Sequence, residues 1–232
     1  MNFHISLCVD KIPKLCNKTS LLYINNYLIR NRITLKTLIP KSEARKIVVQ
    51  RRSELTPIDI ASKTQLIIER LSALDEFIYA KTIHCYIASR PGEVDTRRLI
   101  NYMEGWGKVI VIPKLNKRTK TFNRFNFIGW EYLVRNSEGY LEPHVGIDED
   151  LSDIDLVIVP ALAISVHGQR VGYGGGYYDK LLKKTFAPKI ALAYELQIFD
   201  YIETDIHDTR VDKIVTERRT ITTREYAKPL ST

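Results

Sequence analysis

The chain has 232 residues, which suffices for one α/β domain or two small ones. Hydrophobic residues make up 44% and charged residues 27%, as in ordinary globular proteins with a sizeable core. No apolar run reaches the roughly 18 residues of a membrane-spanning helix, so we expect no membrane partner. The three cysteines form no CxxC pair, which argues against a disulfide scaffold or zinc site and favours a reducing, cytoplasmic location.

The net charge of +8 indicates an anionic partner, and nucleic acid, nucleotides and acidic metabolites all fit. The excess is concentrated near the N-terminus, where Asp10 is the only acid before Glu43. We interpret residues 1–38 as a basic extension without fixed structure or a leader. A mitochondrial or plastid transit peptide is the alternative reading. We expect the folded domain to span residues 39–222, followed by a tail over 223–232.

Apolar periodicity predicts helices and strands that alternate along this domain. Thr56 and Pro57 suit an N-cap and a first helical residue, and an apolar stripe at spacings of three and four follows them. Short apolar and β-branched runs predict buried strands. In chain order we expect helices over 41–54 and 57–74, a strand over 82–88, a helix over 95–105, a strand over 108–113, a hairpin or meander over 122–134, a strand over 155–165, a glycine-rich loop, a helix over 177–184, and strands over 189–194 and 210–216.

This alternation predicts a single three-layer α/β/α domain, Rossmann-like, with a mostly parallel central sheet. In such sheets ligands bind beyond the carboxyl ends of the strands. The sequence therefore places the functional site at that edge before any chemistry is considered.

The densest chemical signal is residues 170–179, Arg-Val-Gly-Tyr-Gly-Gly-Gly-Tyr-Tyr-Asp. Its glycines admit backbone angles closed to other residues, and consecutive N–H groups before a helix form an anion-binding concavity. No Gly-Lys-Ser/Thr closes the loop as in Walker A, and Tyr177 replaces the third glycine of GxGxxG. Arg170 can pair with phosphate, and Asp179 beside phosphate can hold Mg²⁺. A flexible turn is the alternative, but the residues around the glycines favour phosphate binding.

Residues 168–179 resemble the signature G-x-R-x-G-x-G-x-G-[YF]-Y-D of the 5-formyltetrahydrofolate cyclo-ligase (5,10-methenyltetrahydrofolate synthetase) family, and every fixed position is met. The resemblance extends over residues 41–215. It implies a ligase that cyclises 5-formyltetrahydrofolate to 5,10-methenyltetrahydrofolate, with phosphorylation of the formyl oxygen and release of ADP and phosphate. ATP is the implied co-substrate and Mg²⁺ the implied cofactor.

The resemblance also implies residue roles. Arg170, Tyr177 and Lys41 are the expected catalytic residues. The expected ATP contacts are Lys41, Arg45, Arg170, Val171, Gly172, Tyr173, Gly174, Gly175, Gly176, Tyr177 and Tyr178. The expected folate contacts are Glu93, Ala88, Tyr173, Gly174, Gly175, Gly176 and Tyr177. Asp179 and Asp208 are the expected metal ligands, and spacing alone does not separate Asp208 from Asp212. Glu142 and Cys85 are interpreted as structural, and His167 as an exposed residue without a role.

Alternative functions remain open at this point. The chain could be a catalytically inactive folate- or nucleotide-binding homologue, or another ATP-using enzyme on the same fold. A nucleic-acid-binding module would explain the charge, but the basic residues do not gather with aromatics on a sheet face, so we expect no nucleic acid partner. We expect a monomer or a weak dimer.

Overall fold

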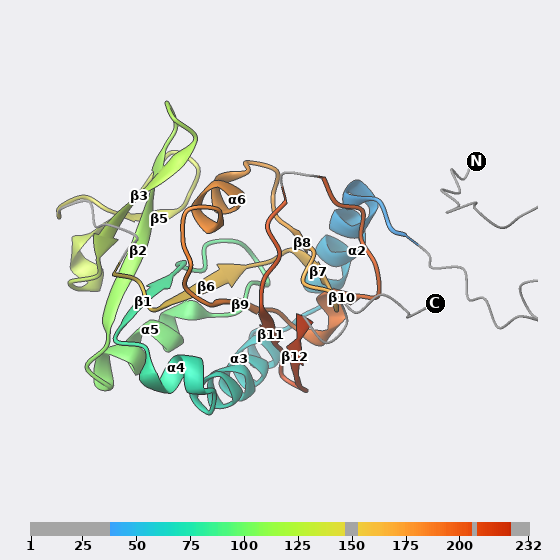
Figure 1. The fold of residues 1–232 in the computed structure, drawn as a ribbon, viewed down its shortest axis with the longest axis horizontal. Coiled ribbons are helices and arrows are strands. Elements are labelled where there is room, and N and C mark those ends of the chain that lie inside the picture. The colour runs from blue at the N-terminus through green and yellow to red at the C-terminus, as the bar shows by residue number, and fades with distance from the viewer. Residues whose placement is uncertain (1–37, 147–152, 206–207, 224–232) are drawn as a thin grey trace, which may run out of the picture. The chain divides into compact units, whose positions relative to one another are not determined.

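The structure, a computed structural model, describes residues 38–146, 153–205 and 208–223 (Figure 1). A seven-stranded sheet has the order β12-β11-β9-β6-β1-β2-β3. Its strands are β1 (Thr82–Cys85), β2 (Val109–Asn116), β3 (Thr121–Asn126), β6 (Leu156–Pro160), β9 (Lys189–Leu192), β11 (Lys213–Val215) and β12 (Thr220–Thr222). Neighbours from β11 to β2 run parallel, whereas β3 and β12 are antiparallel edge strands. The predicted mostly parallel sheet is confirmed.

The described helices are α2 (Lys41–Ser53), α3 (Pro57–Ser72), α4 (Asp75–Tyr79), α5 (Thr96–Gly105) and α6 (Tyr177–Leu182), with short 3₁₀ turns η1 (Trp130–Tyr132) and η2 (Glu195–Gln197). Of these, α3 to α5 cover one face of the sheet and α6 the other. Ile67, Phe77 and Leu99 from α3, α4 and α5 pack in one buried cluster. Leu181 of α6 packs in the cluster on the opposite face (Figure 1). The three-layer α/β/α architecture is therefore as predicted.

The strand residues divide between these two clusters with the period of two that a sheet requires. In β6, Leu156 and Ile158 belong to the α3–α5 side, and Val157 and Val159 belong to the α6 side. All four side chains are fully buried. This burial on both faces explains why the sequence of the strand is uninterruptedly apolar.

Two small sheets complete the fold. One consists of β10 (Ile198–Phe199), β7 (Ala163–Ser165) and β8 (Arg170–Val171), and the other of β4 (Leu133–Arg135) and β5 (Leu141–Pro143). Helix α2 packs on the first of them through Val48 in a third apolar cluster, which also contains Val171 of β8. The strand that leads into the glycine loop is thus fixed against α2.

The expectation of one continuous strand over residues 155–165 was wrong. Strand β6 ends at Pro160, and the chain continues into β7 in a different sheet. Proline has no N–H to donate to a ladder, which favours a strand end at this point. The C-terminal expectation was incomplete: β11 is followed by a turn, in which Thr216 N donates to Arg219 O at 2.9 Å, and then by β12.

The start of α3 confirms the predicted cap. Thr56 Oγ1 accepts a hydrogen bond from Asp59 N at 3.1 Å, and Asp59 Oδ2 accepts one from Thr56 N at 3.0 Å. This reciprocal pair is a capping box, which satisfies otherwise unpaired N–H groups at the helix start. The short helix α4 follows α3 and was not predicted.

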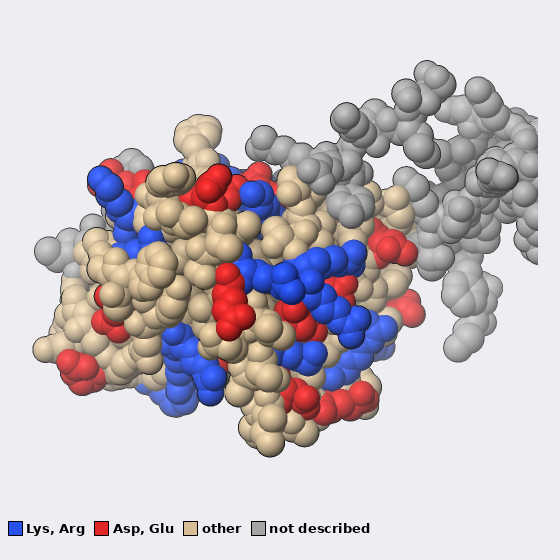
Figure 2. All heavy atoms as spheres, turned by 90° about the horizontal axis from the view of Figure 1, so that it is seen from below, with Lys and Arg blue, Asp and Glu red and all other residues tan. Residues whose placement is uncertain are grey.

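Figure 2 shows one face of the molecule, on which a group of Lys and Arg side chains is bordered by Asp and Glu side chains. In the described ranges, no helix combines the length and the apolarity that crossing a membrane requires.

Candidate active site

The predicted site residues come from segments that follow strands at their carboxyl ends. Glu93 lies in the loop after β1, and the glycine loop of residues 172–176 joins β8 to α6. Helix α2 closes the site from the side, because Arg45 Nε donates a 2.9 Å hydrogen bond to the carbonyl oxygen of Gly172. The spacing of four residues between Lys41 and Arg45 puts both cations on one face of this helix.

Lys41, at the first residue of α2, contacts two aspartates beyond the glycine loop. Its Nζ lies 2.6 Å from Asp205 Oδ2 and 2.5 Å from Asp208 Oδ2. Burial alone lowers the pKa of Lys41, but hydrogen bonds and charge from the two carboxylates outweigh it, and the pKa is raised. Asp208 Oδ2 also accepts a 2.7 Å hydrogen bond from Asp205 N. Lys41 is therefore held as a full cation beside the candidate metal ligand Asp208.

Arg170 and Asp179 form a second ion pair under the glycine loop. The Arg170 side chain is 4% exposed, and its Nη2 lies 2.9 Å from Asp179 Oδ1. Thr209 N donates to the same oxygen at 3.3 Å, which brings Asp179 next to the segment that carries Asp208. The structure thus gathers the predicted phosphate-binding cations and the predicted metal ligands in one network.

The two aspartates suit a magnesium ion that is shared with phosphate. In the described part of the chain, Asp179 Oδ2 and Asp208 Oδ1 accept no hydrogen bond, since every contact of these carboxylates uses the other oxygen. The described residues contain no group of three His, Cys, Asp or Glu side chains that could hold a metal unaided. Mg²⁺ ordinarily takes one or two carboxylates and completes its shell with phosphate oxygens and water. The donor set therefore fits the ion as a partner of a nucleotide.

Asp212 belongs to a different part of the fold. Its Oδ2 accepts a 2.9 Å hydrogen bond from Lys189 N, at the first residue of β9. Its carbonyl accepts the N–H of Thr223 at 3.0 Å. These contacts lie at the amino ends of β9 and β11, and they give Asp212 a structural role.

Glu93 is fixed by three hydrogen bonds. Its Oε2 accepts from Ser89 N and Arg90 N, both at 2.9 Å. Its Oε1 accepts from the hydroxyl of Tyr173 at 3.3 Å. Burial raises the pKa of Tyr173 to about 12, with a further contribution from the Glu93 charge, so the hydroxyl stays a donor at neutral pH. Tyr173 therefore joins the glycine loop directly to Glu93. Ala88 lies in the same loop, and its N–H bonds Thr96 Oγ1 at 2.8 Å.

The two consecutive tyrosines after the glycines point to different surroundings. Tyr177 packs its ring against Phe122 at a centroid distance of 5.3 Å. A Cβ on Gly175 would lie 2.7 Å from the Tyr177 ring, so this close approach requires glycine. Tyr178 is partly buried, with its ring edge-on to Phe122 at 5.0 Å and to His84 at 5.9 Å. Burial of its hydroxyl raises its pKa well above the usual value.

Four further residues considered in the sequence analysis lie outside the ion-pair network. Val171 is buried against α2, so only its backbone is available to a ligand. Cys85 is fully buried, as expected of a core residue, and burial raises its thiol pKa. Glu142 accepts the N–H of Leu115 at 2.8 Å, which supports its structural reading. His167 is half-buried and stacks on Tyr201 at 4.5 Å, so the expectation of an exposed residue was wrong.

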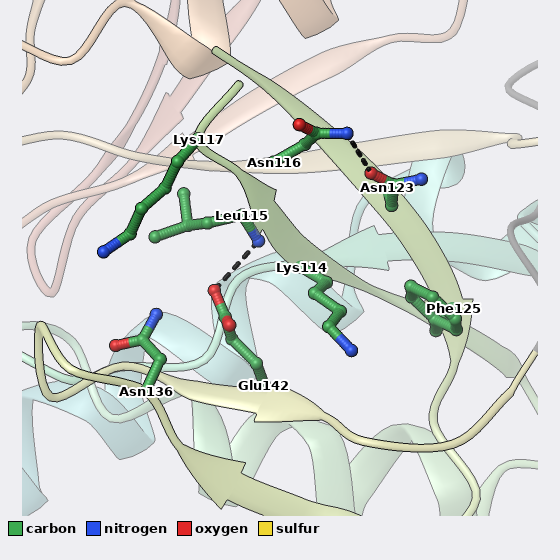
Figure 3. A pocket seen from close by; sticks show the side chains of 8 residues that line it. All are labelled: Lys114, Leu115, Asn116, Lys117, Asn123, Phe125, Asn136 and Glu142. Carbon is green, nitrogen blue, oxygen red and sulfur yellow. Dashed lines mark hydrogen bonds between the residues drawn. The ribbon is translucent and has the colours of Figure 1, made fainter. Parts of the chain in front are cut away.

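A hollow of about 460 Å³ lies beside β2, β3 and β5 (Figure 3). Its lining residues are Lys114, Leu115, Asn116, Lys117, Asn123, Phe125, Asn136 and Glu142. Along β3, Asn123 and Phe125 point to the face opposite Phe122, which contacts α6. Lys114 of β2 is paired with Asn123 and therefore shares its face. The hollow and α6 thus lie on opposite faces of the hairpin. None of the predicted site residues lines it, and its asparagines and lysines are largely engaged with one another and with nearby side chains.

Sequence reasoning missed two cations around Glu93, Arg90 and Arg52, and the aromatic Phe122 beside Tyr177. Arg90 lies over the rings of Tyr140 and Tyr173, at 4.6 and 5.7 Å from their centroids. Arg52 of α2 donates a 3.0 Å hydrogen bond to the Tyr173 hydroxyl. Arg52 stands in an arginine-rich helix, and no sequence signal separates it from its exposed neighbours. The only sequence signal for the contact of Phe122 with Tyr177 was the aromatic content of residues 122–134.

The glycine loop lies beside the buried Arg170 and the partly buried Lys41 and Arg45, in an α/β domain with a mostly parallel central sheet, and this class of domain commonly binds phosphate-containing ligands. The model of the 5-formyltetrahydrofolate cyclo-ligase family matches residues 39–217, and the chain belongs to this family. The family predicted from the glycine loop is thus confirmed, together with the ligase class that it implies.

Individual relatives agree with this assignment. The chain is 30% identical over 175 residues to the 5-formyltetrahydrofolate cyclo-ligase of Haemophilus influenzae, across 72% of this chain and 90% of that protein. It is 28% identical over 180 residues to the Escherichia coli enzyme of that name, across 73% and 96%. The fold resembles that of the Aquifex aeolicus 5,10-methenyltetrahydrofolate synthetase, with a TM-score of 0.71, 30% identity, and coverage of 83% of this chain and 95% of that one.

Proposed function

We propose that this chain uses ATP to cyclise 5-formyltetrahydrofolate to 5,10-methenyltetrahydrofolate, with release of ADP and phosphate. Family membership supports the overall reaction. The structural observation that carries it is the hydrogen bond between Tyr173 of the glycine loop and Glu93. It places the proposed phosphate-binding loop beside the proposed folate-binding carboxylate, as a transfer between the two substrates requires.

The chemical difficulty is the formyl group, whose amide resonance makes its carbon a poor electrophile. The C–N rotation barrier of an amide, roughly 18–20 kcal/mol, measures the strength of this resonance. Attack of the formyl oxygen on the γ-phosphorus of ATP forms a new O–P bond and breaks the bond to ADP, which departs, so that the formyl oxygen becomes part of a phosphate leaving group. The neighbouring arylamine nitrogen then attacks the activated carbon and loses its proton, the carbon–oxygen bond breaks, phosphate departs with both electrons of that bond, and the methenyl bridge remains.

The protein's task in this scheme is positioning and charge neutralisation. Lys41, Arg45 and Arg170 neutralise the phosphates, and N–H groups of residues 172–176 donate to phosphate oxygens. Asp179 and Asp208 would hold Mg²⁺, which supplies positive charge to the phosphate oxygens when bound. A fixed arginine and lysine at the γ-phosphate stabilise the charge that develops during transfer.

Glu93 is the proposed contact for the pterin. A pterin edge presents amine and ring N–H donors, and Glu93 Oε1, which accepts the Tyr173 hydroxyl, has a second lone pair for one of them. Ala88, Tyr177 and the glycines of the loop form the proposed remaining walls of the folate site. The contact between Tyr177 and Phe122 fixes the tyrosine ring beside the loop.

The direct test combines the purified protein with MgATP and 5-formyltetrahydrofolate and follows the absorbance of the methenyl product. We expect product and ADP in equal amounts and neither product nor ADP when folate is omitted. An Asp179→Asn variant should lose turnover and serves as the control for contaminating activity. Binding of both substrates without turnover would support an inactive homologue, and ADP formation with a different acceptor would support another ATP-using enzyme.

We also propose a cytoplasmic protein that is monomeric or weakly dimeric, with no nucleic acid partner. A mitochondrial or plastid location is the alternative if residues 1–38 act as a transit peptide. The relative from Arabidopsis thaliana, 29% identical over 168 residues, carries the word mitochondrial in its name. Fluorescent fusions of the full chain and of a chain that begins at residue 39 test this: identical diffuse distributions support cytoplasmic residence. Retention of the full chain in an organelle would contradict it.

A further inference from the structure

Arg52 is a buried cation that has no role in the reaction proposed above. It is 6% exposed, whereas the adjacent Arg51 is exposed and donates to Leu196 O at 2.8 Å. Burial of a charged group is costly unless it is paired. Within the described ranges, no carboxylate forms a salt bridge with Arg52, and its Nε has no hydrogen-bond partner. Its burial therefore calls for an explanation beyond stability.

Arg52 contacts three segments that build the site. Its Nη2 donates a 2.8 Å hydrogen bond to the carbonyl of Ala161, directly after β6. Its Nη1 donates a 3.0 Å hydrogen bond to the hydroxyl of Tyr173 in the glycine loop. A Cβ on Gly92, whose φ is +68°, would lie 2.8 Å from Arg52 Cβ, so the loop that carries Glu93 packs directly on the arginine.

The hydrogen bond from Arg52 orients the Tyr173 hydroxyl. Because the oxygen accepts from the guanidinium, its own hydrogen is free to point at Glu93 Oε1, 3.3 Å away. The second Glu93 oxygen is already bound by two backbone N–H groups. Arg52, Tyr173 and Glu93 thus form a chain in which each member restricts the next. Hydrogen bonds that involve charged groups are the strong ones, and such chains reinforce one another at low dielectric.

We propose that Arg52 is a positioning residue for folate, which acts through Tyr173 to hold the Glu93 carboxylate in the orientation that accepts the pterin. This inference rests on the proposed role of Glu93. Arg52 touches no substrate itself. Its guanidinium is suited to the task because one planar group reaches Ala161 and Tyr173 at once, which a lysine ammonium on a flexible stem does not reproduce.

The test uses the variants Arg52→Met, Arg52→Lys, Tyr173→Phe and the double variant Arg52→Met/Tyr173→Phe. Folate affinity is measured by equilibrium binding without ATP, and KM for folate and for ATP by turnover. We expect Arg52→Met and Tyr173→Phe each to weaken folate binding about tenfold or more, with a smaller effect on KM for ATP. The double variant should be no weaker than the weaker single variant, because both changes break one chain. Arg51→Met, on the same helix, should bind folate like the unmodified chain.

Three results would overturn the inference: additive effects in the double variant, equal losses for ATP and folate, or full folate affinity in Arg52→Lys. If Arg52→Met does not fold, Tyr173→Phe is compared with Tyr79→Phe, a change at an exposed tyrosine on α4, and only the former should weaken folate binding about tenfold. Failure of the unmodified chain to bind folate would contradict the proposed function instead. If the unmodified chain binds folate and the Arg52→Met variant binds it equally well, only the inference about Arg52 is contradicted.

Discussion

Lys41 and Asp208 form an ion pair in which the ammonium nitrogen lies 2.5 Å from a carboxylate oxygen. A matching pair joins Arg170 to Asp179 at 2.9 Å. In each pair the cation is a proposed phosphate ligand and the acid is a proposed magnesium ligand. The pairs therefore keep the partly buried charges compensated when phosphate and metal are absent. When MgATP binds, both ion pairs would separate: the phosphates would pair with the two cations, and Mg²⁺ would bind the two aspartates. Nucleotide and metal should therefore bind cooperatively.

The metal half of this exchange depends on Asp208. We expect Asp208→Asn to raise the Mg²⁺ concentration that gives half-maximal activity about tenfold or more at fixed ATP, because one anionic ligand is lost. Turnover measured across a Mg²⁺ titration checks this. The matched control is Asp212→Asn, which removes the carboxylate contact with Lys189. It should lower Tm by a few degrees and leave the Mg²⁺ dependence unchanged. An unshifted titration for Asp208→Asn would remove Asp208 from the metal site.

The nucleotide half depends on Arg170. Arg170→Ala should raise KM for ATP about tenfold to a hundredfold, because the variant loses a buried cation that we propose binds phosphate and leaves Asp179 without this ion-pair partner. Folate affinity measured without ATP should change by less than about threefold. Arg210→Ala, a change at an exposed arginine on the neighbouring segment, is the control and should alter neither quantity. Equal losses for ATP and folate would contradict the division of the site into a phosphate end and a folate end.

Much of this site was predictable from the sequence because its strongest signals are local. The glycine loop carries its conformational requirement in consecutive residues, and the α3 cap is set by Thr56 and Asp59 three positions apart. The prediction of one strand over residues 155–165 was wrong because an apolar run indicates that residues are buried but does not indicate which sheet they belong to. The break at Pro160 separates two equally buried strands.

The contacts that were missed join residues distant in sequence. Tyr173 and Glu93 are separated by 80 positions, and Arg52 and Tyr173 by 121. Arg51 and Arg52 are chemically identical neighbours, and only the packing of α2 on the glycine loop and the Gly92 turn makes one of them buried. No pattern in a single sequence distinguishes them.

The glycine loop offers a test of close packing. Gly175→Ala would place a methyl group 2.7 Å from the Tyr177 ring, so the ring or the loop must shift. A displacement of about 1 Å at a positioning residue can cost roughly a hundredfold in rate, and we expect a loss of this order in kcat/KM. The loop is largely exposed and contributes little to the core, so Tm should change little. Gly105→Ala is the control, since a methyl group there meets no atom within 4 Å. Normal kcat/KM in Gly175→Ala would show that the Tyr177 position is immaterial.

His84 on β1 predicts a specific dependence of stability on pH. It is fully buried, and burial, with a contribution from Arg124, lowers its pKa to about 3. Between pH 6.5 and about 3 the unfolded chain binds a proton at this histidine that the folded chain does not. The free energy of unfolding should therefore fall as the pH drops below 6.5, by about 1.4 kcal/mol per pH unit from this group, and the contribution is complete above 6.5.

Replacement of His84 by leucine should remove this part of the slope. Among the residues that the structure describes, neither ring nitrogen has a hydrogen-bond partner, so the apolar side chain should also stabilise the fold at pH 7 by about 1 kcal/mol or more. Urea unfolding of both proteins at several pH values between 4 and 8 measures the two effects, and the difference between the two pH profiles cancels the titration of the other ionisable groups. His84→Gln, which keeps a polar group in the same place without a titrating proton, should lose the slope but gain no stability. Parallel pH profiles for the unmodified chain and His84→Leu would show that His84 protonates equally in the folded and unfolded states.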